Sequence, residues 1–150
     1  MKIAVCIKRV PDTEMRFAIA ADGKSVDPTG LKFEISTFDE YAVEVALRLN
    51  EAHGPGETTV VGLGPDGMAE LLRKALSMGV DRAVHLTAAE VPYDSWAVAQ
   101  ALAAELKEGG YDLVLFGRNA TDTGSGAAGA MTAQLLGLPC VTAVAQLEIA

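Results

Sequence analysis

The stretch DLVLFGRNATDTGSGAAG (Asp112–Gly129) contains a short apolar run, a long loop and the start of a helix in immediate succession. The apolar run is rich in Val and Leu, which suits a strand buried on both faces of a parallel sheet. Comparable runs occur at Lys2–Ile7, Thr58–Leu63 and Arg82–Leu86, with a weaker one at Val141–Ile149. The sequence therefore predicts a parallel sheet of about five strands.

Helical patterns separate these runs. Residues 37–40 (TFDE) form the pattern of a capping box, with Thr37 as N-cap and Glu40 at the third helical position, and the helix they open stops at Gly54-Pro55. Further helices are expected at about 68–78, 95–107 and 127–136. Alternating strands and helices with short connections indicate a three-layer, Rossmann-like α/β fold, for which we expect the strand order 3-2-1-4-5.

One segment interrupts the alternation. Residues 14–35 contain short β-like pieces around a turn at 21–24 (ADGK), and we interpret them as a β-hairpin inserted after the first strand. A length of 150 residues without linker, repeat or low-complexity segment predicts one domain over residues 1–150.

Composition excludes several classes of protein. Half of the residues are hydrophobic, which excludes disorder, and a formal charge of −8 argues against a nucleic-acid partner. No apolar run approaches the length of a membrane span, and the N-terminus lacks a signal-peptide pattern. Cys6 and Cys140 lie in apolar surroundings and form no CxxC pattern, so we expect two buried thiols in a cytoplasmic protein.

The turn Gly62–Gly67 (GLGPDG) has the formal spacing G-x-G-x-x-G. A dinucleotide site of this kind needs a carboxylate about 20 residues later to bind a ribose, and residues 85–87 (HLT) contain none. A tight turn with Asp66 as helix cap accounts for the pattern. A role as one wall of a nucleotide pocket stays open.

The loop Gly117–Gly126 is longer than a plain strand-to-helix connection and leads directly into a helix. Its small residues expose backbone N–H groups near a helix N-terminus, which favours an anion, and Arg118 adds a cation. The hydroxyls of Thr121, Thr123 and Ser125 add polar contacts. We favour a phosphate-binding loop over the alternative of a flexible surface loop.

The expected strand order brings three turns together. Ligands of such sheets bind beyond the carboxyl ends of the strands where the order reverses, here between the first and fourth strands. The turns that leave these strands are Lys8–Asp12 and Gly117–Gly126, and Gly62–Gly67 is their neighbour. No catalytic triad, paired acid and base, metal-ligand spacing or P-loop stands out. The sequence therefore predicts nucleotide binding without catalysis and without a metal.

Several segments resemble the β subunit of electron transfer flavoproteins, in order and over essentially the whole chain. They are IAVCIKRVPD (3–12), FDEYAVE (38–44), LRKALSMGVDRA (72–83) and DLVLFGR (112–118). The resemblance implies the adenine nucleotide α-hydrolase-like variety of the Rossmann-like fold.

The resemblance also implies a function. In that family the α subunit holds FAD, and the β subunit carries a second adenine nucleotide, AMP or FAD. The complex is an electron carrier rather than an enzyme and accepts electrons from acyl-CoA-type and other flavin dehydrogenases. The residues that the resemblance assigns to the nucleotide are Cys6, Ser36, Thr37, Phe38, Asp39, Leu63, Gly117, Arg118, Asn119, Ala120, Thr121, Asp122, Thr123, Gly124, Ser125, Gly126, Ala127 and Ala128.

This chain departs from the family in two respects. Family members carry polar Asp, Asn, Gln and Thr side chains where this chain has residues 123–128, and Asn where it has Ser36. We therefore expect backbone N–H groups to do more of the binding. Family β subunits also continue into a C-terminal docking region, so we expect a short or truncated member.

Two other functions are compatible with the same fold. One is a stand-alone, homodimeric adenine-nucleotide sensor that pairs through the edge of its last strand, 141–149. The other is a nucleotide hydrolase, which the lack of an activating base or metal cluster disfavours.

Overall fold

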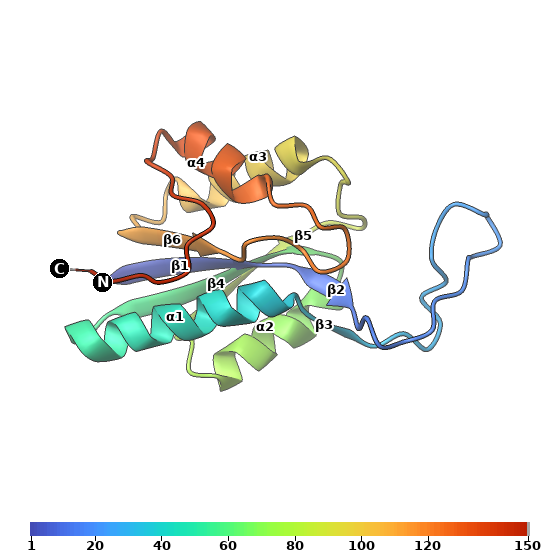
Figure 1. Ribbon diagram of the computed structural model, residues 1–150, viewed down its shortest axis with the longest axis horizontal. Helices are drawn as coiled ribbons and strands as arrows, with labels where there is room; N and C mark the ends of the chain where they lie inside the picture. Colours follow the sequence, from blue (N-terminus) through green and yellow to red (C-terminus); the bar gives the residue numbers. More distant parts are fainter. Residues whose placement is uncertain (150) are drawn as a thin grey trace.

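A computed structural model describes residues 1–149, and its centre is a parallel sheet of four strands. The sheet has the order β5-β4-β1-β6 (Figure 1). Its strands are β1 (Lys2–Ile7), β4 (Glu57–Gly64), β5 (Arg82–Thr87) and β6 (Leu113–Phe116). In chain order these are strands 3-2-1-4, which confirms the predicted topology for the first four strands.

Two helices cover each face of the sheet. Helices α1 (Thr37–His53) and α2 (Met68–Ser77) lie on one face, and α3 (Ser95–Leu106) and α4 (Ala128–Leu136) lie on the other (Figure 1). The predicted three-layer α/β fold is therefore confirmed.

The central strand β1 explains why both faces are covered. Its alternate side chains point to opposite faces, and all of them from Ile3 to Ile7 are buried. Ile3, Val5 and Ile7 belong to a core cluster with residues of α1 and α2, whereas Ala4 and Cys6 pack with Leu102 and Leu106 of α3. A strand that is apolar on both faces requires two helical layers.

The strand ends define two edges of different character. At the amino edge, carboxylates fix the start of the strands: Asp112 Oδ2 accepts Lys2 N–H, and Asp81 Oδ2 accepts Thr58 N–H, both at 2.8 Å. Because the strands are parallel, all four leave the sheet at the opposite, carboxyl edge. The loops that leave them therefore meet there.

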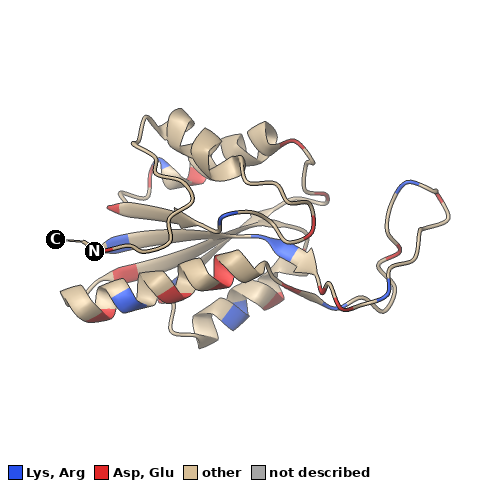
Figure 2. Ribbon diagram, in the orientation of Figure 1, with Lys and Arg blue, Asp and Glu red and all other residues tan. Residues whose placement is uncertain are grey.

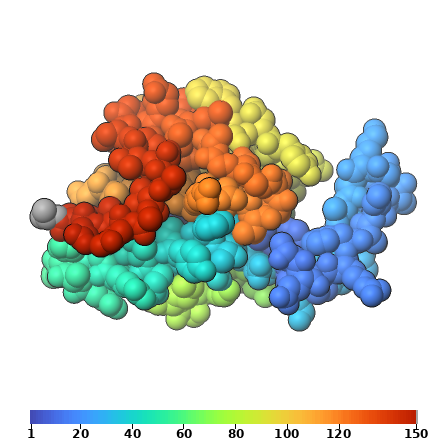
Figure 3. Space-filling view, viewed as in Figure 1, coloured from blue at the N-terminus to red at the C-terminus, as the bar shows by residue number. Residues whose placement is uncertain are grey.

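The predicted hairpin follows β1 directly. Strand β2 (Arg9–Pro11) pairs antiparallel with β3 (Phe33–Ile35), and Ile19 and Val26 form an isolated bridge farther out. Asp22 Oδ1 accepts the N–H groups of the two residues after Gly23 and so closes the outer turn. Figure 3 shows this hairpin standing away from the main body of the molecule.

The predicted fifth strand is wrong. Residues 141–149 have no ladder partner within the described part of the chain, and Ala143 has a positive φ of 54°, which interrupts an extended run. Leu147 and Ile149 instead pack against the core cluster of α1 and α2. The strand edge on which the homodimeric sensor depended is therefore not present in residues 141–149.

Three local predictions are also corrected. The N-cap of α1 is Ser36 rather than Thr37, without a side-chain capping bond, and Glu40 pairs with Lys74 on α2. The N-cap of α2 is Gly67 rather than Asp66. Cys6 is buried as expected, but Cys140 is exposed because α4 ends at Gly137 and the chain beyond it runs over the surface.

Charge is distributed unevenly over the helices. Figure 2 shows charged residues of both signs along α1, whereas α4 carries none. Nowhere in residues 1–149 does a helix combine the length and the apolar character needed to cross a membrane.

Truncation of one buried side chain in the central strand β1 tests the assignment of the core. Ile3 is fully buried, so Ile3→Ala should lower the free energy of unfolding by about 2–5 kcal/mol, measured by urea denaturation. Ile19 on the hairpin is 77% exposed, so Ile19→Ala should change it by less than about 0.5 kcal/mol. Equal losses in the two variants would contradict the assignment of the core.

Candidate functional site

A cavity of about 380 Å³ opens at the carboxyl edge of the sheet. Its floor contains Cys6, Leu63 and Phe116, which lie at or near the ends of β1, β4 and β6. The sequence predicted convergence at this position, because the strand order reverses between β1 and β6.

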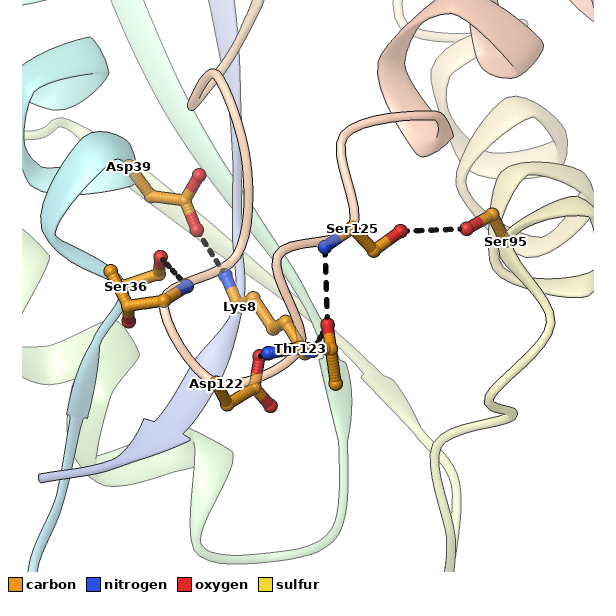
Figure 4. Close-up of polar contacts among 8 residues, drawn as sticks. Lys8, Ser36, Asp39, Ser95, Asp122, Thr123 and Ser125 are labelled. Atoms are coloured by element: carbon orange, nitrogen blue, oxygen red, sulfur yellow. Dashed lines mark hydrogen bonds and ion pairs between the residues drawn. The ribbon is translucent and has the colours of Figure 1, made fainter. Parts of the chain in front are cut away.

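One wall of the cavity is polar. Lys8 Nζ lies 2.7 Å from Asp122 Oδ1 and 3.4 Å from Thr123 Oγ1 (Figure 4). On the other side of the loop, the hydroxyls of Ser125 and Ser95 are 2.9 Å apart, and Ser95 begins α3. Side chains from the residue that follows β1, from the glycine-rich loop (117–126) and from α3 thus make polar contacts around the opening.

A buried carboxylate holds the ends of β1 and β6, the two strands between which the strand order reverses. Asp39, in the first turn of α1, accepts Lys8 N–H at Oδ2 (2.8 Å) and Gly117 N–H at Oδ1 (2.9 Å). Lys8 and Gly117 are the first residues after β1 and β6. Residue 117 must be glycine here, because a Cβ would collide with Asp39 Oδ1.

Burial determines the protonation of Asp39. Removal from water raises the pKa of the carboxyl group from 3.8 to about 6, and the bonds from Lys8 N–H and Gly117 N–H and the charge of Lys8 oppose this effect. The negative charge of Asp122 acts in the same direction as burial with a smaller effect, and the value of about 6 includes it. The carboxylate is therefore ionised at neutral pH but titrates within a readily accessible range.

The glycine-rich loop is held by its own bonds and by Ser36. Thr121 N–H donates to Ser36 Oγ (3.3 Å), which explains why Ser36 makes no capping bond to α1 (Figure 4). Within the loop, Ala120 N–H donates to Ser125 O and Gly124 N–H donates to Ala120 O, both at 2.9 Å. These bonds give the loop a defined shape.

The loop ends at the N-terminus of α4, which faces the cavity. Ala128 and Gly129 line the cavity, and the N-cap Ala127 supplies no side-chain acceptor. The first N–H groups of a helix have no acceptor within it and carry the positive end of its dipole. This terminus can accept an anion.

The cavity gathers many, but not all, of the predicted residues. Those that line it are Cys6, Asp39, Leu63, Gly117, Asn119, Ala120, Asp122, Thr123, Ser125, Gly126 and Ala128. Those outside the lining are Ser36, Thr37, Phe38, Arg118, Thr121, Gly124 and Ala127. Arg118, the predicted cation, is exposed, and the cations that line the cavity are Lys8 and Arg9.

From the sequence we expected no ligand contact from Lys8, from Arg9 or from the apolar wall of the cavity. Arg9 lies 3.3 Å over the ring of Phe33, and both residues line the cavity. The apolar wall, as we use the term, is the part of the lining formed by Val91, Pro92, Tyr93, Val98 and Leu102. Lys8 could have been found from the sequence because it directly follows the first strand. Residues 91–93 could not, because they form no motif.

The thiol in the floor of the cavity is not activated. Burial and, to a smaller extent, the charge of Asp39 raise the pKa of the Cys6 thiol far above its ordinary value, so the thiol stays protonated and is a poor nucleophile. Among residues 1–149, no three His, Cys, Asp or Glu side chains gather where they could bind a metal ion.

Comparison with known proteins identifies relatives of the whole chain. The model of the electron transfer flavoprotein domain matches residues 24–150. The chain is 38% identical to electron transfer flavoprotein subunit beta of Bradyrhizobium diazoefficiens over 99% of its own length and 59% of the relative's. Identity to the Bacillus subtilis subunit is 38%, over 99% of this chain and 58% of the relative. A mitochondrial subunit of Oryza sativa subsp. indica is 38% identical, over 93% of this chain and 56% of the relative. The chain thus spans less than three-fifths of the length of these relatives.

Asp39 should make stability depend on pH in a specific direction. The folded chain holds this proton up to a pH of about 6, whereas the unfolded chain releases it near 3.8. The contribution of Asp39 to stability is therefore full below about pH 4 and is lost as the pH rises through about 6. The free energy of unfolding of the wild type, minus that of Asp39→Asn, should fall by about 3 kcal/mol between pH 4 and pH 7. Urea denaturation at several pH values measures this difference, and a constant difference would contradict the assignment.

Proposed function

The chain belongs to the β-subunit family of electron transfer flavoproteins, and from this premise we propose that it binds one adenine mononucleotide, AMP, in the cavity at the carboxyl edge. The observation that carries the proposal is the meeting of an apolar wall, a polar wall and a helix N-terminus around one cavity. Sites for small ligands combine an apolar lining with a few convergent polar groups in this way.

The size of the cavity favours a mononucleotide. Its volume of about 380 Å³ lies near the lower end of the range of small-molecule sites, roughly 300–1,000 Å³. A complete FAD needs considerably more room than AMP. We therefore propose AMP as the ligand of this cavity.

The two walls suggest an orientation for the nucleotide. We propose that the base contacts the apolar lining residues Val91, Val98 and Leu102, and that the phosphate contacts Lys8 and the first N–H groups of α4. In this orientation Lys8, rather than the exposed Arg118, supplies the cation for the phosphate.

In this proposal, main-chain N–H groups make the phosphate contacts for which other family members have polar side chains. A Cβ at Gly126 would lie 2.8 Å from Arg118 O, so the close fold of the loop requires a glycine there. Residues 126–128 (GAA) bring no polar side chain, and their N–H groups remain for the phosphate. The site therefore fits a phosphate that is bound by main-chain N–H groups and by one lysine, Lys8.

The wider role follows from the names of the relatives. A β subunit implies an α subunit as partner, and we propose that this chain is the nucleotide-binding, non-catalytic part of such an electron carrier. In this assembly the α subunit holds the FAD that accepts electrons from flavin dehydrogenases. The bound AMP stabilises the domain and takes no part in the redox step.

Addition of AMP tests the nucleotide site directly. At a concentration about 100 times its dissociation constant, AMP should raise the free energy of unfolding of the full chain by about 2.7 kcal/mol. Thermal and urea denaturation measure the effect. No stabilisation by AMP would contradict the proposed function, and stabilisation by FAD alone would contradict the choice of AMP.

Replacement of Lys8 tests the orientation. Lys8→Gln removes the cation and leaves Asp122 uncompensated beside the phosphate, so AMP should bind about tenfold to a hundredfold more weakly by calorimetry. Adenosine, which lacks the phosphate, should bind both proteins equally. The control is Lys24→Gln on the exposed hairpin, which should change neither affinity. A loss of adenosine affinity in Lys8→Gln would place the base, not the phosphate, at Lys8.

A further inference from the structure

Tyr93 is the most exposed large apolar side chain among the described residues, and it lines the cavity. Its exposed fraction is 96%, so the ring packs against almost none of the protein. Exposed aromatic rings are common on protein surfaces, but this ring stands at the edge of a cavity whose neighbouring lining, Val91 and Pro92, is also apolar. The ring can therefore gain contact area from whatever occupies the cavity.

The loop that carries Tyr93 is fixed at both ends. Ala88 N–H donates to Gly64 O (3.0 Å), which ties the start of the loop to the end of β4. At the other end, Asp94 Oδ1 accepts Trp96 N–H (3.0 Å) as the N-cap of α3, and Ser95 meets Ser125. Tyr93 is thus held next to the opening although its own side chain is free.

The geometry points to Tyr93 as a nucleotide-binding residue whose ring stacks on the adenine base. This inference rests on the proposed function and adds to it the residue that recognises the base. A planar base offers a π face, and stacking on an aromatic side chain contributes about tenfold or more to affinity. The apolar wall on the same side of the cavity favours the base there, while the phosphate lies toward Lys8.

The test compares two ligands and three proteins. AMP and adenosine are titrated calorimetrically into the full-length wild type, Tyr93→Ala and Tyr93→Phe. Tyr93→Ala should weaken both ligands by the same factor, about tenfold or more, because both contain the base. Tyr93→Phe keeps the ring and should bind both within about twofold of wild type.

Two further proteins serve as controls. Tyr41→Ala removes a tyrosine that is 62% exposed on α1 and lies outside the cavity lining, so it should change neither affinity. Lys8→Gln should show the complementary pattern, with a loss for AMP and none for adenosine. Circular dichroism of each variant checks that the fold is retained.

The possible outcomes separate this inference from the proposed function. If Tyr93→Ala binds AMP and adenosine as the wild type does, the stacking role is overturned and the nucleotide site stands. If Tyr93→Phe loses as much affinity as Tyr93→Ala, the hydroxyl rather than the ring is responsible, and stacking is likewise overturned. If the wild type binds neither ligand, the proposed function and this inference both fail, and the exposed ring is better explained as a contact for a protein partner.

Discussion

The carboxylate of Asp39 is the contact on which the site depends. It accepts the N–H groups of Lys8 and Gly117, the first residues beyond two neighbouring parallel strands, at the point where the strand order reverses. Buried backbone N–H groups need acceptors, and here one side chain from the start of α1 satisfies two of them. The directions in which the chain leaves β1 and β6 are therefore set together. The loop that closes the cavity starts from that fixed point.

This arrangement explains how a chain with a formal charge of −8 could offer the phosphate site that we propose. Overall charge is an average over the surface, whereas the cavity combines Lys8 with the uncapped N-terminus of the uncharged helix α4. In our account the loop contributes shape and main-chain donors, and its glycines at 117 and 126 allow the close approaches that this shape requires. Burying Asp39 has a cost, visible in its raised pKa, and the fold accepts that cost to hold the two strand ends.

Much of this could be predicted from the sequence, and the errors have physical reasons. Apolar runs and helical periods identify buried elements, and the handedness of crossovers then gives the strand order and the meeting of the loops. The pattern at 141–149 is also apolar, but a strand exists only if a neighbour pairs with it, which no local pattern reveals. Arg118 and Lys8 are both cations beside predicted turns, and which of them faces the cavity depends on tertiary packing. The same holds for Tyr93, whose place beside the cavity no sequence pattern indicates.

Chemical-shift mapping by NMR tests the central claim most directly. In ¹H–¹⁵N spectra of the labelled chain, AMP should shift the amide signals at the carboxyl edge, above all Lys8, Leu63, Gly117 and residues 125–128. The amide of Thr58, at the amino edge of the sheet, should not move. Shifts confined to the amino edge, or no shifts at saturating AMP, would contradict the account.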